Sequence, residues 1–101
     1  MQSGHEGCGW VYIIASRWRG AIYTGVTGDL PARIVQHRER SGSRHAVKYQ
    51  IDRLVWAEPH DTMLGAIARE KAIKKWRRAW KIELIEAANP EWDDLFETLN
   101  A

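Results

Sequence analysis

The chain has 101 residues, of which 45% are hydrophobic and 28% are charged. This length suits one globular domain, because two separate cores of about 50 residues each would bury too little surface. The charged fraction, with only three prolines, excludes a disordered or fibrous chain. The net charge of +2 is too small to indicate a nucleic-acid partner by itself.

The single cysteine and the N-terminus bear on location. Cys8 cannot form an intramolecular disulfide, which is typical of a reducing compartment. Residues 1–9 contain no cationic segment followed by an apolar run, and no apolar run reaches the length of a membrane span. We therefore expect a cytoplasmic protein with a flexible segment over residues 1–9 and one domain over residues 10–101.

Charge is distributed unevenly along the chain. Residues 17–81 hold all 15 basic residues and six acidic ones, a local charge of +9. Residues 83–101 hold six acidic residues and no basic residue. A positively charged body is typical of proteins that contact a phosphate backbone, whereas a solvated helix face is the alternative explanation.

Two β-strands are predicted near the N-terminus. Residues 9–16 and residues 21–27 are β-branched and aromatic runs joined by a short polar link. The short link predicts an antiparallel hairpin. With an even number of residues in the loop, Tyr12 and Tyr23 lie on the same face of the sheet, whereas an odd loop or a bulge would separate them.

A helix is predicted from residue 30 to about residue 40. Asp29 stands before it and is a good N-cap. Within this helix Arg33, His37 and Arg40 share one stripe, because residues spaced by four and by seven lie on the same face.

The sequence pattern of the second half of the chain predicts one strand and three helices. The strand covers residues 51–58 and is closed by Pro59. Helices follow over residues 62–75, from residue 77 to about residue 88, and over residues 91–99. The last helix is acidic and its apolar side consists of Trp92, Leu95 and Phe96.

The helix over residues 62–75, capped by Asp61 or Thr62, carries a carboxylate on its apolar stripe. Glu70 lies on the stripe that the spacing predicts to be buried. An isolated buried charge is costly, so Glu70 must be paired, protonated or bound to a metal. Lys74 at i+4 and Arg33 from the preceding helix are the candidate partners for an ion pair.

Before the short acidic helix, the order strand, strand, helix, strand, helix, helix predicts an α/β fold with a small three-stranded antiparallel sheet flanked by helices. Short motifs follow one another along this order: Val11-Tyr12, Tyr23-Thr24-Gly25, residues 29–37, residues 68–76 and residues 89–92. As an ordered set they resemble the GIY-YIG nuclease superfamily, and in particular its small single-domain members. The resemblance covers residues 10–92. Trp10 stands where the first motif of the family has Gly, and Thr24 where the second has Ile.

The resemblance implies roles for individual residues in the hydrolysis of a phosphodiester. Glu70 would hold a single Mg²⁺ or Mn²⁺ ion, since a carboxylate is a hard oxygen ligand. Tyr12 would be the general base, and because its normal pKa is about 10, Arg33 or the metal would have to lower that pKa. Arg33 would also bind the scissile phosphate.

Three further residues complete the implied catalytic set. Tyr23 and His37 would assist the base, and Asn89 would support the metal end of the site or its geometry. As alternatives, the tyrosines could pack a sheet face, His37 could be a packing histidine, and Asn89 before Pro90 could end a helix. The full set is Tyr12, Tyr23, Arg33, His37, Glu70 and Asn89.

Cationic residues on the first helix, in the loop after it and around residues 71–78 predict contacts with a nucleic-acid backbone. Trp76 and Trp80 are interleaved with them, and we expect these two residues to pack in the core, with stacking on bases as the alternative. The predicted backbone contacts are Arg38, Arg40, Arg44, Lys48, Lys71, Lys74, Lys75, Arg77 and Arg78.

The resemblance therefore implies a metal-dependent endonuclease that hydrolyses DNA, in repair or in the processing of structured DNA, with a separate partner for target selection. Two other classes stay open. One is a nucleic-acid-binding module that keeps the fold without cutting. The other is a protein-interaction domain that uses the acidic residues 83–101.

Overall fold

The computed structural model describes residues 9–39 and 51–99. Among these residues no helix is long and apolar enough to cross a membrane. Residues 1–8 of the predicted N-terminal segment, and the predicted phosphate contacts Arg40, Arg44 and Lys48, lie outside the described residues. In chain order the elements are β1 (Gly9–Ala15), β2 (Ile22–Thr27), α1 (Leu30–Arg38), β3 (Arg53–His60), α3 (Met63–Lys74), α4 (Arg78–Ala88) and α5 (Phe96–Leu99).

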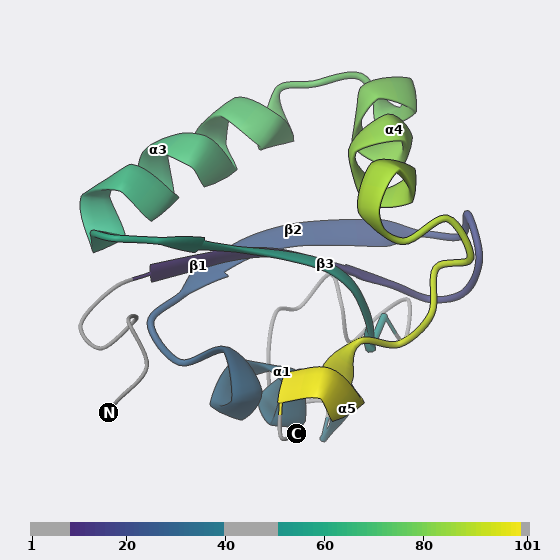
Figure 1. The fold of residues 1–101 in the computed structure, drawn as a ribbon, viewed down its shortest axis with the longest axis horizontal. Helices are drawn as coiled ribbons and strands as arrows, with labels where there is room; N and C mark the ends of the chain where they lie inside the picture. The colour runs from purple at the N-terminus through teal and green to yellow at the C-terminus, as the bar shows by residue number, and fades with distance from the viewer. Residues whose placement is uncertain (1–8, 40–50, 100–101) are drawn as a thin grey trace.

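The three strands form one antiparallel sheet in the order β2-β1-β3, which confirms the predicted α/β class. The helices cover both faces of this sheet, with α3 and α4 on one side and α1 and α5 on the other (Figure 1). Successive side chains of a strand point to opposite faces, so the central strand β1 contributes to two cores. Val11 and Ile13 pack in the core that contains residues of α3 and α4, and Ile14 packs in the core of α1.

The β1–β2 hairpin has the predicted loop parity. Ala15 pairs with Ile22, so residues 16–21 form a loop with an even number of residues. Ile14 is the partner of Tyr23, and it lies two residues from Tyr12 along β1. Tyr12 and Tyr23 therefore share a face of the sheet, as predicted.

Side-chain caps start α1 and α3 at the predicted positions. The Asp29 carboxylate accepts a hydrogen bond from the Ala32 backbone N–H, and the Thr62 hydroxyl accepts one from the Gly65 N–H. Such caps satisfy amide groups that have no partner within the helix. Thr62, rather than Asp61, is thus the cap of α3.

The third strand is displaced by two residues from the prediction of residues 51–58. It spans Arg53–His60, so Pro59 lies inside the strand, opposite Trp10 of β1. Proline lacks a backbone N–H and is tolerated in edge strands. Because β3 is an edge of the sheet, Pro59 does not end it.

The predicted C-terminal helix over residues 91–99 is wrong for most of its length. Only Phe96–Leu99 are helical, and Trp92 has a left-handed backbone with φ of 56°. Trp92 is fully buried in the core on the α3 and α4 side, while Leu95 and Phe96 pack on the α1 side. The segment therefore passes from one face of the sheet to the other (Figure 1), which a single straight helix would not do.

Candidate active site

Three aromatic rings from three elements meet on the α1 face of the sheet. The ring centroid of Tyr12 on β1 lies 6.5 Å from that of Tyr23 on β2 and 5.8 Å from that of His37 on α1. Tyr23 and His37 are 5.7 Å apart. The structure thus brings together three residues of the predicted catalytic set.

Gly25 leaves the space that the Tyr12 ring occupies beside β2. A Cβ atom at position 25 would be 2.5 Å from Tyr12 Cζ, and closer still to the hydroxyl oxygen. Gly25 is also the register partner of Tyr12. The sequence pattern assigned Gly25 no role beyond its motif, although a glycine inside a strand often marks a place where another group approaches the backbone.

The Tyr12 hydroxyl and His37 Nε2 form a buried hydrogen bond of 3.0 Å. Burial, with smaller effects of Tyr23 and Glu70, raises the pKa of Tyr12 well above its usual value, and Arg33 opposes this only in part. Burial and the Arg33 charge lower the pKa of His37. Both shifts favour a protonated phenol and a neutral imidazole at neutral pH, and in the tautomer with the proton on Nδ1 the phenol donates to Nε2. Arg33 lowers the pKa of Tyr12 as expected, but burial outweighs this effect and the net shift is upward.

Arg33 lies on α1, one turn before His37, and is half-buried. Its charge acts on both Tyr12 and His37. No carboxylate among residues 9–39 and 51–99 forms an ion pair with it. No described carboxylate therefore neutralises the fixed charge of Arg33, which leaves its guanidinium able to bind a phosphate.

Glu70 is buried on α3 as its position on the apolar stripe predicted, with 8% of its surface exposed. Its partner is Lys74, whose Nζ lies 2.6 Å from Glu70 Oε2, rather than Arg33. The same Nζ lies 5.6 Å from the centre of the Tyr23 ring. Glu70 and Lys74 therefore extend the aromatic cluster at the β2 edge of the sheet, where α3 contacts this strand.

The side chains of the described residues that could bind a metal suit only one kind of metal site. Among the described residues no three His, Cys, Asp or Glu side chains lie close enough to hold an ion together. Mg²⁺ is often bound by one or two carboxylates and keeps several waters. The buried Glu70 carboxylate fits a cation of this kind, provided that the Lys74 ammonium, half of whose side chain is exposed, moves aside.

Asn89 has a structural role. β3 has a bulge, since Ile13 pairs with Trp56 while Ile14 pairs with Leu54, which leaves Val55 without a register partner. Asn89 Nδ2 donates to the Val55 carbonyl at 3.0 Å. Its side chain also accepts from the Asp93 N–H and donates to the Asp93 carbonyl. Asn89, predicted to support the geometry of the catalytic site, thus holds the C-terminal segment to β3.

Two of the predicted phosphate contacts take part in the fold. The Arg38 guanidinium pairs with Asp94 and lies 4.4 Å from the centre of the Phe96 ring. Arg78 donates two hydrogen bonds of 2.7 Å to the carbonyls of Arg19 and Gly20, in the β1–β2 loop. Lys71, Lys75 and Arg77, in contrast, are exposed.

The acidic end of the chain is folded against the positively charged body. Asp94 pairs with Arg38, and Glu86 accepts two hydrogen bonds of 2.8 Å from Arg19. Glu86 also accepts a hydrogen bond from Trp92 Nε1 at 2.7 Å. Part of the uneven charge along the sequence is therefore neutralised within the molecule.

Comparison with known proteins agrees with this geometry. Residues 8–83 match the family model described as the GIY-YIG catalytic domain. A UPF0213 protein of Staphylococcus saprophyticus is 33% identical over 76 residues, which cover 75% of this chain and 92% of the relative. UPF0213 proteins of Staphylococcus epidermidis and Staphylococcus aureus are 32% and 33% identical over the same shares of both chains. No solved structure matches significantly. The chain therefore belongs to the GIY-YIG family, whose catalytic domain is of the nuclease type.

Proposed function

We propose that this protein is an endonuclease that hydrolyses phosphodiester bonds in DNA with the aid of one Mg²⁺ or Mn²⁺ ion at Glu70. The observation that supports this most is the buried hydrogen bond between Tyr12 and His37, in a cluster that also contains Arg33 and Glu70. A site for hydrolysis needs a group that takes a proton from water and groups that offset the charge of the phosphate. The cluster contains both kinds of group.

Tyr12 and His37 act as a pair in this proposal. A phenol with a raised pKa is a poor base by itself. In the tautomer in which Tyr12 donates to His37 Nε2, the Tyr12 oxygen can take a proton from the attacking water while its own proton passes to Nε2. The charge that develops then resides on the imidazole, and Tyr12 stays neutral throughout. The general base is therefore the pair of Tyr12 and His37, and His37 is the final acceptor of the proton.

Arg33 binds the scissile phosphate, and its planar guanidinium suits two phosphate oxygens at once. A divalent cation bound at Glu70 would supply further neutralisation of the phosphate and of the leaving oxygen. Contacts to the nucleic-acid backbone come from exposed cations such as Lys71 and Lys75. Such contacts carry little sequence information, so DNA structure or a partner protein selects the target, as in repair or the processing of structured DNA.

A second candidate function is supported by the ion pair in the site. Lys74 neutralises the one buried carboxylate of the cluster, and Tyr12 is protonated. These features also suit a module that binds nucleic acid without cutting it. Cleavage of nucleic acid by the purified protein distinguishes the nuclease from the binding module.

The deciding experiment incubates the purified full chain with branched, nicked, single-stranded and duplex DNA, and with matching RNA, in Mg²⁺ or Mn²⁺. We expect cleavage of DNA that falls by about 100-fold or more in the Tyr12→Phe and Glu70→Gln variants, in line with the loss of a general base or of charge stabilisation. Glu91→Gln, an exposed carboxylate far along the chain, is the matched control. Salt-dependent binding without turnover on any substrate would establish the non-cleaving module, and equal cleavage by Glu70→Gln would contradict the role of Glu70.

A further inference from the structure

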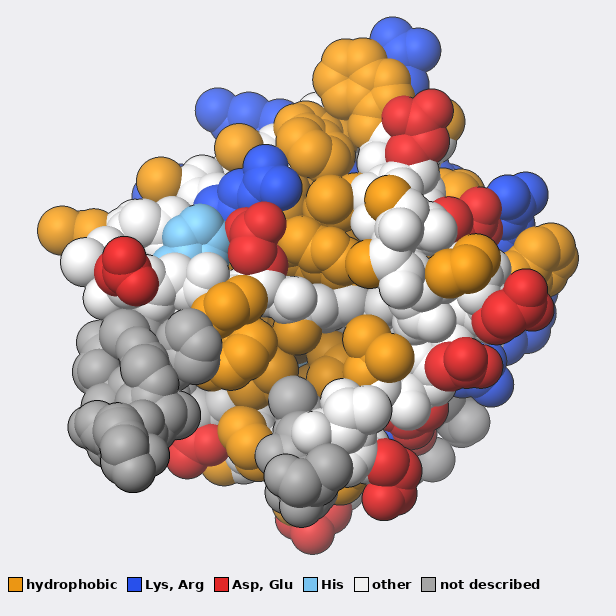
Figure 2. Space-filling view, viewed as in Figure 1, with side chains coloured by type: hydrophobic (Ala, Val, Ile, Leu, Met, Phe, Trp, Pro, Cys, Tyr) orange, Lys and Arg blue, Asp and Glu red, His pale blue; other side chains and the backbone are white. Residues whose placement is uncertain are grey.

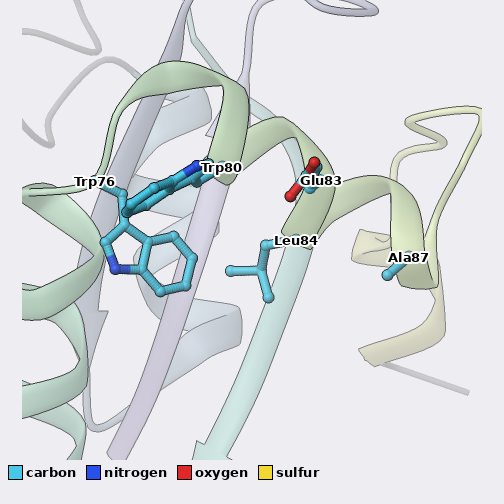
Figure 3. Close-up of a pocket in the computed structure, with 5 residues that line it drawn as sticks. All are labelled: Trp76, Trp80, Glu83, Leu84 and Ala87. Atoms are coloured by element: carbon cyan, nitrogen blue, oxygen red, sulfur yellow. The ribbon is translucent and has the colours of Figure 1, made fainter.

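A pocket of about 560 Å³ lies on α4, next to the end of α3. Figure 3 shows the indole rings of Trp76 and Trp80 next to each other at one end of it, with Leu84 beside the Trp76 ring and Ala87 farther along α4. Their centroids are 6.3 Å apart and the ring planes meet at 78°. Glu83 supplies the one charged side chain of the lining.

The expectation that both tryptophans pack in the core is wrong for Trp80, which is 48% exposed. Trp76 is partly buried against the core of α3 and α4. A large aromatic side chain in water is unfavourable unless something covers it. The pocket is therefore suited to a flat apolar ligand that lies against the exposed indole.

Cationic side chains lie beside both indole rings. The Arg77 guanidinium lies 4.9 Å from the centre of the Trp80 ring, and that of Arg69 lies 5.5 Å from the centre of the Trp76 ring. Lys75 and Arg77, on either side of Trp76 in the chain, are exposed and form no ion pair within the described residues. Figure 2 shows the hydrophobic patch between α3 and α4 with Lys and Arg side chains along part of its border and acidic side chains beside them.

We propose that this pocket binds an unpaired nucleobase of the substrate strand, an inference that rests on the proposed action on nucleic acid. Bases stack on indole rings whatever their sequence, and the phosphates on either side need cations. The surface offers both, with Trp80 as the stacking platform and Lys75 and Arg77 as phosphate contacts. The Glu83 carboxylate can accept a hydrogen bond from an amino group of the base. An apolar protein segment would use the rings but would gain nothing from the cations.

The test measures binding by fluorescence anisotropy to the full chain with Glu70→Gln, without metal, so that no cleavage occurs. One probe is a labelled DNA duplex, a second is the same duplex with a four-nucleotide single-stranded overhang, and a third has abasic sites in this overhang. We expect Trp80→Ala to weaken binding of the second probe by about tenfold, since stacking contributes roughly 1–3 kcal/mol per base. Binding of the first and third probes should change by less than about twofold.

Trp18→Ala is the matched control, because Trp18 is also exposed, at 54%, and also has an arginine over its ring, but lies in the β1–β2 loop. Trp80→Phe keeps a smaller platform and should give an intermediate loss. Equal effects of Trp80→Ala and Trp18→Ala, or an equal loss with all three probes, would overturn the base-binding pocket and leave the proposed nuclease function standing. If the parent protein binds none of the probes, both proposals are wrong.

Discussion

The hydroxyl of Tyr12 lies 3.0 Å from Nε2 of His37, a residue that follows it by 25 positions in the chain. The bond is buried between β1 and α1, and burial shifts the two pKa values in opposite directions, upward for Tyr12 and downward for His37. Both shifts favour the neutral form of each residue. The pair can therefore transfer a proton at neutral pH without first forming a buried charge.

The lowered pKa of His37 predicts how stability depends on pH. Below its ordinary pKa of 6.5 the unfolded chain binds a proton at this residue that the folded protein does not bind. The free energy of unfolding should therefore fall as the pH drops from 6.5 through the lowered pKa of His37. Thermal melts between pH 7.5 and pH 5 check this, with His37→Gln as the variant that loses this part of the dependence. If the stability of His37→Gln depended on pH as strongly as that of the wild type, the prediction would be wrong. His60→Gln is the parallel variant for this comparison.

Gly25→Ala should disturb the site more than its small size suggests. The added methyl group would lie 2.5 Å from Tyr12 Cζ, so the tyrosine ring must move or the strands must separate. We expect a loss of stability of about 1–3 kcal/mol, as is usual for overpacking in a core, with a fall in cleavage. Urea unfolding and the cleavage assay measure the two effects. Gly65→Ala is the comparison, because its nearest contact is the Thr62 hydroxyl at 3.1 Å, and an equal loss there would show that the effect is not specific to Tyr12.

Lys74→Met should strengthen the binding of a divalent cation. Lys74 Nζ occupies one oxygen of Glu70, so a metal has to displace this ammonium group before it can bind. Removing the competitor lowers the Kd for Mn²⁺, which electron paramagnetic resonance of free Mn²⁺ measures without any turnover. Lys75→Met removes an equal charge from the next position, which is exposed. If both variants bind Mn²⁺ equally well, the change reflects net charge and Glu70 is not the ligand.

Asn89→Ala should lower stability and leave the chemistry intact. The substitution removes the donor to the Val55 carbonyl at the bulge of β3 and both bonds to Asp93. A buried acceptor that loses its partner costs about 1–3 kcal/mol. Well below the midpoint of its thermal transition the variant should cleave DNA at the rate of the wild type. If the folded variant instead cleaved about 100-fold more slowly, as on removal of a catalytic group, Asn89 would return to the catalytic set.

Glu86→Gln should lower the Tm and make the Tm less dependent on pH in the acid range. Hydrogen bonds from Arg19 and Trp92 lower the pKa of Glu86 from 4.5 to about 2. The stabilisation from its charge is thus complete above pH 4.5 and is lost as the pH falls toward 2. Melts of the wild type should show this decline, and melts of Glu86→Gln should lack part of it. Glu83→Gln, one turn earlier on α4 and exposed, should melt like the wild type at both ends of the range.

The sequence by itself determined the elements that depend on neighbours in the chain. Loop parity placed Tyr12 and Tyr23 on one face, and the Asp29 cap marked the start of α1. The spacing of apolar residues placed Glu70 on the buried side of α3. These features follow from strand alternation, helix periodicity and capping, each of which acts over a few residues.

Only the tertiary structure decided which distant groups meet. It chose Lys74 over Arg33 as the partner of Glu70, and it placed Asn89 at a bulge that arises from the register between β1 and β3. It also buried Trp92, which the pattern had placed on a helix, and left Trp80 in solvent. Such outcomes depend on how sheet and helices pack, since contacts between distant segments compete for the same space and for the same hydrogen-bonding groups. The periodicity of one segment carries no information about that competition.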